Sequence, residues 1–368
     1  MAIKDKPYYP TAKQLKIREA LNREWYSLRS ILGYQWAMFL FLLGGREAGK
    51  SYAVTEFFVR QFVKYGRPFY WLRLTDASQK KLLNNNAQKL IDPDIRRRYD
   101  LDLVTNGDAV YVVTKRSQPD KKGKTRIIEK KLMARVLALS TFYNDKGSGL
   151  FDKDFLNDPK MYYNICLDEM NREANEKNSF DIVYAFTNQL ENLVRSTKQR
   201  LRVICIGNTL QEASDILCAF NFIPEDFGRF KLKKKRAVVE YIEPSEKYKA
   251  RRKGTIADIL MPNASTFTNK VNVDDTLVNT KRLTKPTSII KFGKDTSRWF
   301  TVWDSNVIAQ YNREKVHVIS MRPYIDELFN TEMRDNVIKI FDARGFTYKN
   351  LVTFKMFQKE LELLKPRK

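Results

Sequence analysis

The chain has 368 residues, more than one domain usually holds, and its 43% hydrophobic and 12% aromatic content excludes wholesale disorder. Lysine and arginine number 67 against 43 aspartate and glutamate residues, so the net charge is +24 and favours a nucleic-acid partner. The longest apolar run, residues 36–43, is far shorter than the roughly 20 residues that cross a bilayer, so we expect no membrane partner. One histidine, His317, and three cysteines without paired spacing favour a reducing compartment, the cytoplasm, and exclude a Cys/His metal site.

The first part of the chain alternates predicted helices and strands. Residues 11–32 have apolar residues at helical spacing and predict a leading amphipathic helix. The apolar run 36–43 predicts a strand, which a glycine-bearing turn separates from a helix at 52–65. Residues 67–74 predict a second strand, and this alternation is typical of a parallel sheet.

A β-meander is predicted next, with strands at 101–104, 110–114 and 134–140. The loop before its third strand is basic, and phosphate contacts from such a loop would carry no sequence information. A flexible, solvated loop without a ligand is the equal alternative. The basic residues that we predict to bind nucleic acid there are Lys115, Arg116, Lys121, Lys122, Lys124 and Arg126.

The α/β pattern returns after the meander. Short strands are predicted at 162–167 and 201–206, around a helix at 180–195. Both strands are largely apolar, which is typical of the centre of a sheet that is buried on both faces. The sequence therefore predicts an α/β domain with a central, mostly parallel sheet.

A change of composition marks the predicted domain boundary. Lysine and arginine crowd together after residue 228, and we interpret residues 229–260 as a basic linker. This divides the chain into a large α/β domain at 1–228, the linker, and a small α+β domain at 261–368. The elements predicted in the small domain are strands at 299–309 and 315–319 and helices at 324–341 and 356–364.

The turn after the first strand has the pattern of a phosphate-binding loop, G-x-x-x-x-G-K-[ST], directly between a strand and a helix. Its backbone N–H groups and the helix N-terminus would face the phosphates of a nucleotide. We expect Lys50 to bridge the β and γ phosphates of ATP and Ser51 to hold Mg²⁺. The residues that we predict to bind the nucleotide are Gly44, Gly45, Arg46, Glu47, Ala48, Gly49, Lys50 and Ser51.

Two later strands end in polar residues that suit ATP hydrolysis. The strand at 162–167 leads into Asp168 and Glu169, which has the form of a Walker B motif. Asp168 would complete the magnesium site, and Glu169 would orient and deprotonate the attacking water. Asn208 follows the strand at 201–206 and is predicted to contact the γ-phosphate or that water, with a simple turn asparagine as the alternative.

Three arginines follow the helix at 180–195, namely Arg195, Arg200 and Arg202. An arginine that enters a neighbouring subunit's site would neutralise transition-state charge and accelerate hydrolysis by roughly three to five orders of magnitude. We place this role at Arg195, with Arg200 as the second choice. An ordinary solvated surface charge is the alternative for each of them.

These motifs together resemble the DNA-encapsidation ATPases of Picovirinae-type small tailed phages, over roughly residues 9–230. The likeness combines an arginine inside the phosphate loop with a Walker B motif and an arginine before the last strand. The matching segments are GGREAGKSY (44–52), FVKYG (62–66) with Arg73 after it, LDEM (167–170) followed by Arg172 and Glu173, LVR (193–195) and RVICIGN (202–208).

The resemblance implies a fold, an activity and partners. The fold is an additional-strand (ASCE) P-loop ATPase followed by an RNase H-like domain that lacks nuclease activity. The activity is ATP hydrolysis that drives double-stranded DNA into a prohead, with Arg195 acting in trans. The partners are a homo-oligomeric ring, expected to be a pentamer, and the portal of the prohead, where the protein would dock from the host cytoplasm. Some relatives also dock through a structural packaging RNA.

Two alternatives stay open from the sequence. A large terminase would carry an active nuclease, which needs acidic residues that bind two metal ions. A nucleic-acid-binding scaffold would bind ATP but hardly hydrolyse it, and would have no need of Glu169. The acidic residues available to a nuclease site are Asp304, Asp326, Glu327, Glu332 and Asp335.

Overall fold

The protein forms two compact units in the computed structural model. Unit 1 comprises Met1–Leu210 and Asp226–Val271, and unit 2 comprises Gln211–Glu225 and Asn272–Lys368. None of the helices in the described part of the chain is long and apolar enough to cross a membrane. The structure describes residues 25–119, 125–145, 162–171, 180–194, 200–208, 214–224, 226–260, 277–279, 281–284, 286–293, 295–304, 306–311 and 331–364.

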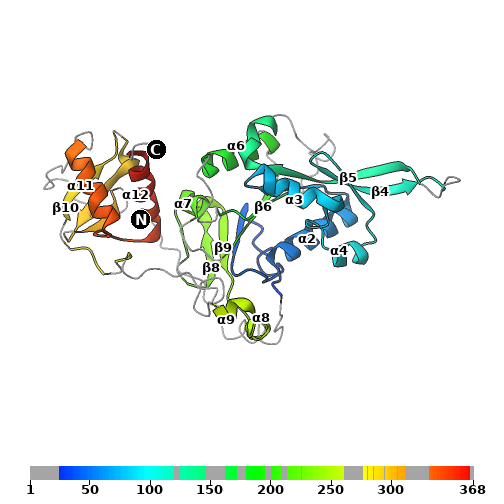
Figure 1. Ribbon diagram of the computed structural model, residues 1–368, viewed down its shortest axis with the longest axis horizontal. Coiled ribbons are helices and arrows are strands. Elements are labelled where there is room, and N and C mark those ends of the chain that lie inside the picture. Colours follow the sequence, from blue (N-terminus) through cyan, green and yellow to red (C-terminus); the bar gives the residue numbers. More distant parts are fainter. Residues whose placement is uncertain are drawn as a thin grey trace. The chain divides into compact units, whose positions relative to one another are not determined.

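Unit 1 is built on a nine-stranded sheet with the order β3-β4-β5-β2-β6-β7-β1-β9-β8 (Figure 1). Neighbouring strands from β5 through β2, β6, β7 and β1 to β9 are parallel, while β3, β4 and β8 are antiparallel to their neighbours. The strands are β1 (Phe39–Leu43), β2 (Phe69–Arg73), β3 (Leu103–Asn106), β4 (Ala109–Arg116), β5 (Ile127–Ala138), β6 (Tyr162–Asp168), β7 (Arg200–Gly207), β8 (Gly228–Leu232) and β9 (Ala237–Tyr241).

The strand order confirms the predicted ASCE sheet, because β7 lies between the phosphate-loop strand β1 and the Walker B strand β6. The central strands are largely apolar and are buried on both faces, as the sequence predicts. The helices and 3₁₀ turns of unit 1 are α2 (Lys50–Tyr65), α3 (Asp76–Ala87), α4 (Pro93–Arg98), η1 (Leu139–Asp145), α6 (Ile182–Val194), η2 (Lys233–Lys235), α8 (Glu246–Arg252) and α9 (Ile256–Leu260).

Helix α2 connects the phosphate loop to the opposite end of the sheet, where β2 begins. It begins after Gly49 and ends at Gly66, whose positive φ of 66° lets its N–H bond to the carbonyl of Phe62 at 2.7 Å. Its buried face packs Phe58 against the rings of Phe69 and Trp71, with centroids 5.2 and 6.4 Å apart. This packing fixes the start of the helix, and with it the loop, against the sheet.

Strands β4 and β5 form a long hairpin that extends beyond the rest of the sheet in Figure 1. The last residues of β4 and the first residues of β5 are exposed, whereas the ends that join the sheet are buried. The predicted meander is thus confirmed, with a longer third strand than the sequence indicates. Ile127 and Ile128 remain 41% and 58% exposed near the hairpin's end.

Residues 25–32 do not continue the predicted leading helix, and that part of the prediction is wrong. They form turns, because Tyr26 is tied by its N–H to the carbonyl of Ala48 at 2.9 Å and by its hydroxyl to Glu240 at 2.8 Å. Leu28 and Ile31 are buried in the core instead of lining a helix face. The remainder of the predicted helix, residues 11–24, lies outside the described residues.

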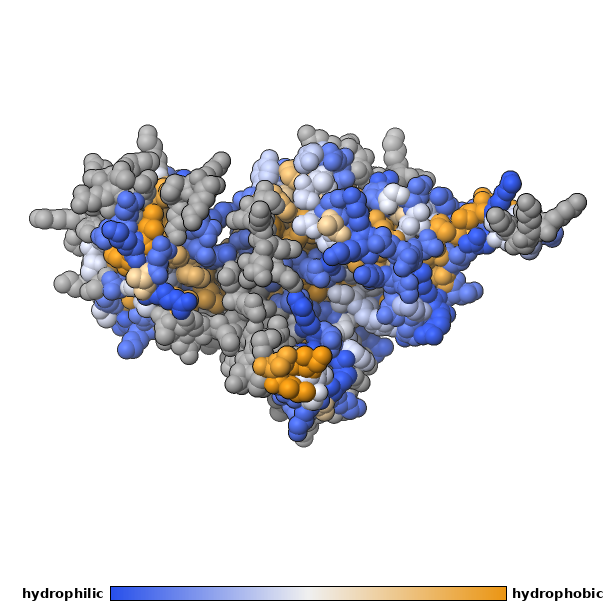
Figure 2. Space-filling model, viewed as in Figure 1, coloured by the Kyte–Doolittle hydropathy of each residue, from blue (hydrophilic) through white to orange (hydrophobic). Residues whose placement is uncertain are grey.

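The structure differs from the predicted basic linker at its first residues, which form β8 and β9 of the main sheet. Strand β9 pairs with β1 along its whole length, and the buried pair of Arg229 and Glu240, 2.5 Å apart, joins β8 to β9. Beyond α8, Ile256, Ile259 and Leu260 of α9 are more than two-thirds exposed and form an apolar patch (Figure 2). Within the predicted linker, only the lysines and arginines that flank these elements have the basic composition on which the prediction was based.

Unit 2 is a small α+β unit with a four-stranded sheet in the order β10-β11-β12-β13. Phe357 is fully buried at its centre and meets the rings of Phe292 and Phe300 edge to face. The predicted strand at 299–309 is a hairpin, while the RNase H-like fold stays a prediction, and residues 315–319 lie outside the described part. Its elements are α7 (Asp215–Ala219), β10 (Pro286–Lys291), η3 (Thr296–Arg298), β11 (Trp299–Trp303), β12 (Val307–Gln310), α11 (Thr331–Asp342), β13 (Thr347–Tyr348) and α12 (Leu351–Leu364).

Candidate active site

The phosphate loop connects β1 to α2 and encloses the amine of Lys50. The Lys50 side chain is buried, and its Nζ donates to the carbonyl oxygens of Gly44 and Gly45 at 2.8 and 2.6 Å. Burial lowers the pKa of Lys50 to about 8, although the charge of Asp168 acts in the opposite direction. Gly49 has a φ of 84°, and a Cβ there would lie 3.2 Å from the ring of Trp25. The loop is therefore preformed around a cation that faces any bound phosphate.

The two acidic residues of the Walker B motif lie at the carboxyl end of β6. Asp168 is 7% exposed, and its Oδ1 accepts a hydrogen bond of 3.2 Å from the hydroxyl of Ser51. Glu169 adopts a left-handed φ of 57°, which ends the strand, and its side chain is 56% exposed. The strand thus directs one carboxylate toward the phosphate loop and leaves the other accessible to solvent.

The donors around Asp168 fit a magnesium ion. Mg²⁺ prefers hard oxygen ligands and usually takes only one or two from protein, with the rest from water and phosphate. A hydroxyl and a carboxylate oxygen 3.2 Å apart supply two such ligands beside the loop. Among the described residues, no group of three or more His, Cys, Asp or Glu side chains could hold a metal on its own.

Arg73 links both acids and was missed as a site residue by sequence reasoning. It ends β2, the strand beside β6, and its Nη1 lies 2.8 Å from Asp168 Oδ2 while Nη2 pairs with Glu169. The side chain is 8% exposed, and its Nε has no partner among the described residues. A charged last residue in the otherwise apolar strand FYWLR is the sequence signal that could have identified it.

Asn208 follows β7, between the phosphate loop and the Walker B motif. Gly207 is paired with Leu43, and Ile206 with Asp168, so the next residue of β7 comes beside the start of the loop. Asn208 is partly exposed. A Cβ on Gly207 would lie 2.9 Å from Met170 and 3.0 Å from Leu43, which shows how closely the three strand ends approach one another.

Helix α8 supports the phosphate loop from residues that the sequence suggested were linker. The hydroxyl of Tyr248 donates to the carbonyl of Arg46 at 2.8 Å, and Arg251 donates to the carbonyl of Glu47 at the same distance. Arg252 is 8% exposed and lies 3.1 Å from the carboxylate of Glu47. These contacts hold the loop's outer turn, where Glu47 has a φ of 63°.

Some of the predicted arginines and basic loop residues lie in the described part of the chain, and the others lie outside it. Arg195 lies outside the described part, while Arg200 is the first residue of β7, at the opposite end of the sheet from the phosphate loop. Lys121, Lys122 and Lys124 of the hairpin loop also lie outside it. Its other basic residues are described: Lys115 and Arg126 are exposed, and Arg116 pairs with Asp102 at 2.6 Å.

Comparison with known proteins decides the family. The family model of the podovirus DNA encapsidation protein (Gp16) matches residues 22–335, most of the chain. The chain belongs to this family. The DNA packaging protein of Bacillus phage phi29 is 25% identical to this Gp16-family chain over 209 residues, which are 56% of the chain and 52% of the relative. The DNA packaging protein of Bacillus phage B103 is 23% identical over 243 residues, 65% of the chain and 64% of the relative. The chain therefore spans about half the length of the phi29 relative that it matches.

Solved structures of packaging motors share the fold of this Gp16-family chain. The phi-28 gp11 DNA packaging motor is similar with a TM-score of 0.57 and 14% identity, covering 94% of this chain and 100% of that one. The phi-29 viral genome packaging motor assembly is similar with a TM-score of 0.51 and 19% identity, covering 92% and 100%. At these identities the likeness shows the fold alone, and it agrees with the α/β architecture of unit 1.

Proposed function

We propose that this Gp16-family protein is an ATPase that moves double-stranded DNA into a preformed prohead. The observation that carries the proposal is the convergence of Lys50, Ser51 and Asp168 at the carboxyl ends of β1 and β6, with Glu169 at the strand's tip. Membership of the DNA encapsidation family supports the direction of this chemistry toward genome packaging. The DNA packaging proteins of phages phi29 and B103 are the relatives that suggest the DNA substrate.

The residues of the site divide the work of hydrolysis. Lys50 neutralises the β and γ phosphates of ATP, and Ser51 and Asp168 hold magnesium, which would neutralise further phosphate charge. Glu169 orients the attacking water and accepts its proton, and Asn208 contacts the γ-phosphate or that water. Arg73 acts as a positioning residue, because its two prongs hold both carboxylates in place.

A Glu169→Gln variant tests the division of roles between the two acids. Binding of ATP should persist, because Asp168 and Lys50 are intact, while turnover should fall by roughly 10²- to 10⁴-fold. The matched control is Glu191→Gln, which changes an exposed carboxylate on α6. Turnover is measured with and without DNA, and packaging is measured with proheads. Normal hydrolysis by the variant would contradict the role of Glu169, whereas negligible turnover by the unmodified protein, with and without DNA, would support the scaffold alternative.

The proposal includes a ring in which Arg195 completes the site of the neighbouring subunit. Support comes from the chain's path, since α6 ends at Val194 and Arg200 opens β7 at the amino end of the sheet, away from the subunit's own phosphate loop. Arg195→Ala subunits should bind ATP but hydrolyse it poorly. Mixing them with Glu169→Gln subunits should partly restore hydrolysis, because some interfaces then combine an intact Glu169 with an intact Arg195. An arginine that acts within its own subunit predicts no recovery at any ratio.

The remaining parts of the proposal concern partners and the second unit. The hairpin's Lys115, Arg116 and Arg126, with the lysines between them, would contact DNA phosphates without reading sequence. Docking at the prohead portal, a pentameric ring and the use of a packaging RNA belong to the same proposal, as does the host cytoplasm as the starting compartment. Plasmid cleavage with Mn²⁺ tests the nuclease alternative, since cleavage that is lost in Asp304→Ala would favour an active terminase.

A further inference from the structure

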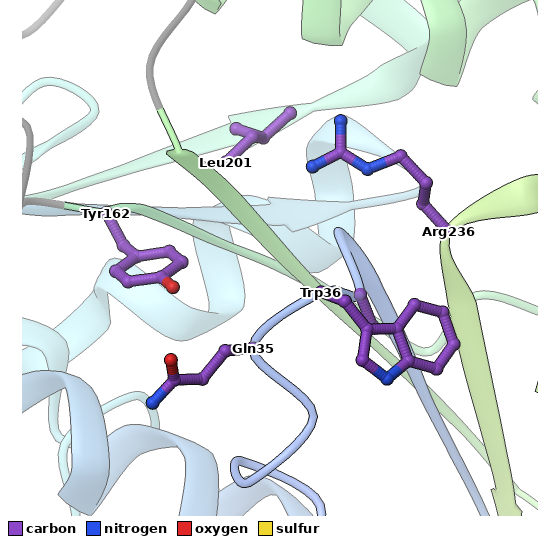
Figure 3. A pocket seen from close by; sticks show the side chains of 6 residues that line it. Gln35, Trp36, Tyr162, Leu201 and Arg236 are labelled. Carbon is purple, nitrogen blue, oxygen red and sulfur yellow. The ribbon is translucent and has the colours of Figure 1, made fainter. Parts of the chain in front are cut away.

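A hollow of about 240 Å³ opens in unit 1 at the amino ends of the parallel strands, the edge opposite the phosphate loop (Figure 3). Its wall residues are distant in sequence, but each comes just before a strand or within its first two residues. Trp36 precedes β1, Tyr162 and Leu201 belong to the starts of β6 and β7, and Arg236 precedes β9. Parallel strands bring their amino ends to one edge, so the sheet itself assembles this hollow.

The walls of the hollow are aromatic and its rim is polar. In Figure 3 the rings of Tyr162 and Trp36 lie on opposite sides, the amide of Gln35 lies near Tyr162, and the guanidinium of Arg236 points toward Leu201. Trp36 is 37% exposed, so its ring is accessible. Aromatic faces stack on nucleobases whatever their sequence, and an amide both donates to and accepts from the edge of a base.

Behind the aromatic wall lies a partly buried cation. The guanidinium of Arg202 is 4.1 Å from the ring centre of Tyr162 and 5.3 Å from that of Phe57. Burial lowers the pKa of Arg202 to about 10 and the charge of Arg67 acts in the same direction, while Tyr162 raises it, so the group stays charged at neutral pH.

The positive charge at this edge lacks a balancing acid. In the described part of the chain, neither Arg202 nor Arg236 has a carboxylate within ion-pair distance, and the exposed residues Lys233–Lys235 come directly before Arg236. Arg202 donates instead to the amide oxygen of Asn164 at 3.3 Å, so its charge is hydrogen-bonded but not neutralised, and a nearby anion would be favoured. The edge therefore combines a surface for stacking with a surplus of positive charge.

We infer that the hollow binds an unpaired nucleotide of a nucleic-acid strand, with the base between Trp36 and Tyr162 and the adjoining phosphates on Arg236 and the lysine turn. Bases of a DNA duplex are stacked on one another and cannot enter such a site without being unpaired. The hollow thus takes a different ligand from the double-stranded substrate proposed above. The inference is independent of ATP hydrolysis, because none of its residues touches the phosphate loop.

Binding of labelled oligo(dT), oligo(U) and a duplex of the same length tests the inference. Trp36→Ala and Arg236→Ala should each weaken the single strands about tenfold, since stacking and charge-assisted contacts are lost. The duplex should be affected less than about twofold by Trp36→Ala. The matched controls are Tyr184→Ala, an exposed aromatic side chain on α6, and Arg97→Ala, an exposed arginine on α4. Both controls should bind all three probes as the unmodified protein does.

The outcomes distinguish the possible readings of this edge. Loss of oligo(dT) and oligo(U) binding to the same extent supports a site for base and phosphate, and a selective loss of oligo(U) supports a site that also contacts the 2′-hydroxyl. Equal weakening of the duplex by Trp36→Ala would overturn the inference in favour of a simple phosphate surface. Unchanged binding, with a shift in oligomeric mass instead, would overturn it in favour of a contact between subunits.

Discussion

The parallel strands of the central sheet have two ends, here called the carboxyl edge and the amino edge. The side chains at these two ends carry opposite chemistry. At the carboxyl ends, the acids of β6 are balanced by Arg73 and lie beside the buried amine of Lys50. At the amino ends, Arg202 and Arg236 have no acidic partner among the described residues. A strand the length of β6 separates them by roughly 20 Å. On the two proposals above, ATP chemistry and single-strand binding lie at opposite ends of the same parallel strands.

The largest expected effect comes from removing the charge balance of the carboxyl edge. Arg73→Met keeps much of the side chain's volume but leaves Asp168 and Glu169 beside each other without their cation. Without the two-pronged contact the carboxylates are no longer held in place, so kcat should fall by about 10²-fold at neutral pH. Steady-state ATP turnover of the purified variant measures the fall.

Arg73→Lys is the informative control for this substitution. It retains the charge but cannot form the two-pronged contact, so kcat should fall less than in Arg73→Met. Oligo(dT) binding at the amino edge should be unchanged in both variants, because that edge shares none of the residues involved. A wild-type kcat in Arg73→Met would show that the arginine does not position the acids.

Sequence reasoning reached the carboxyl edge because its signals are local. The apolar run of β1 and the glycine pattern after it fall within a dozen residues and predict strand, loop and helix together. The Asp168–Glu169 pair also follows its own strand directly. Such features need only the knowledge that parallel strands align their carboxyl ends, so the candidate site could be predicted before any tertiary contact was known.

The parts that were missed depend on contacts between distant segments. Arg73 joins the site only because β2 pairs with β6, and Arg252 only because α8 returns to Glu47. The five residues of β9 are too short an apolar run to stand out among lysines, and their pairing with β1 makes them a strand. Local composition suggested a linker there. Pairing with a distant strand overrides local composition, and it cannot be inferred from the neighbouring residues alone.

Removing the lysines of the amino edge tests how much of its nucleic-acid affinity comes from phosphate contacts. A Lys233→Gln, Lys234→Gln, Lys235→Gln variant should weaken single strands and duplex alike by more than about tenfold at low salt, because we expect these exposed lysines to contact phosphates, which both ligands carry. The slope of log affinity against log salt for duplex DNA should become shallower by about 2 to 3. The control removes three exposed lysines elsewhere in unit 1, Lys80, Lys81 and Lys89, with an unchanged slope expected. Loss confined to the single strands would place these lysines inside the nucleotide site.

The smallest expected effect is a change of ATP affinity with pH as Lys50 titrates. It distinguishes the carboxyl edge from the amino edge without any mutation. Because burial lowers its pKa to about 8, Lys50 is mostly charged at pH 7 and mostly neutral at pH 8.5 in the free protein. ATP affinity measured in EDTA should therefore fall about fourfold between these values, and binding at the higher pH should take up a proton.

The same rise in pH should slightly increase the free energy of unfolding, since a charged Lys50 is disfavoured only in the folded state. Oligo(dT) affinity should not follow this titration, because Arg202, with a pKa of about 10, keeps its charge throughout the range. A parallel loss of ATP and oligo(dT) binding would mean that the two edges do not act separately.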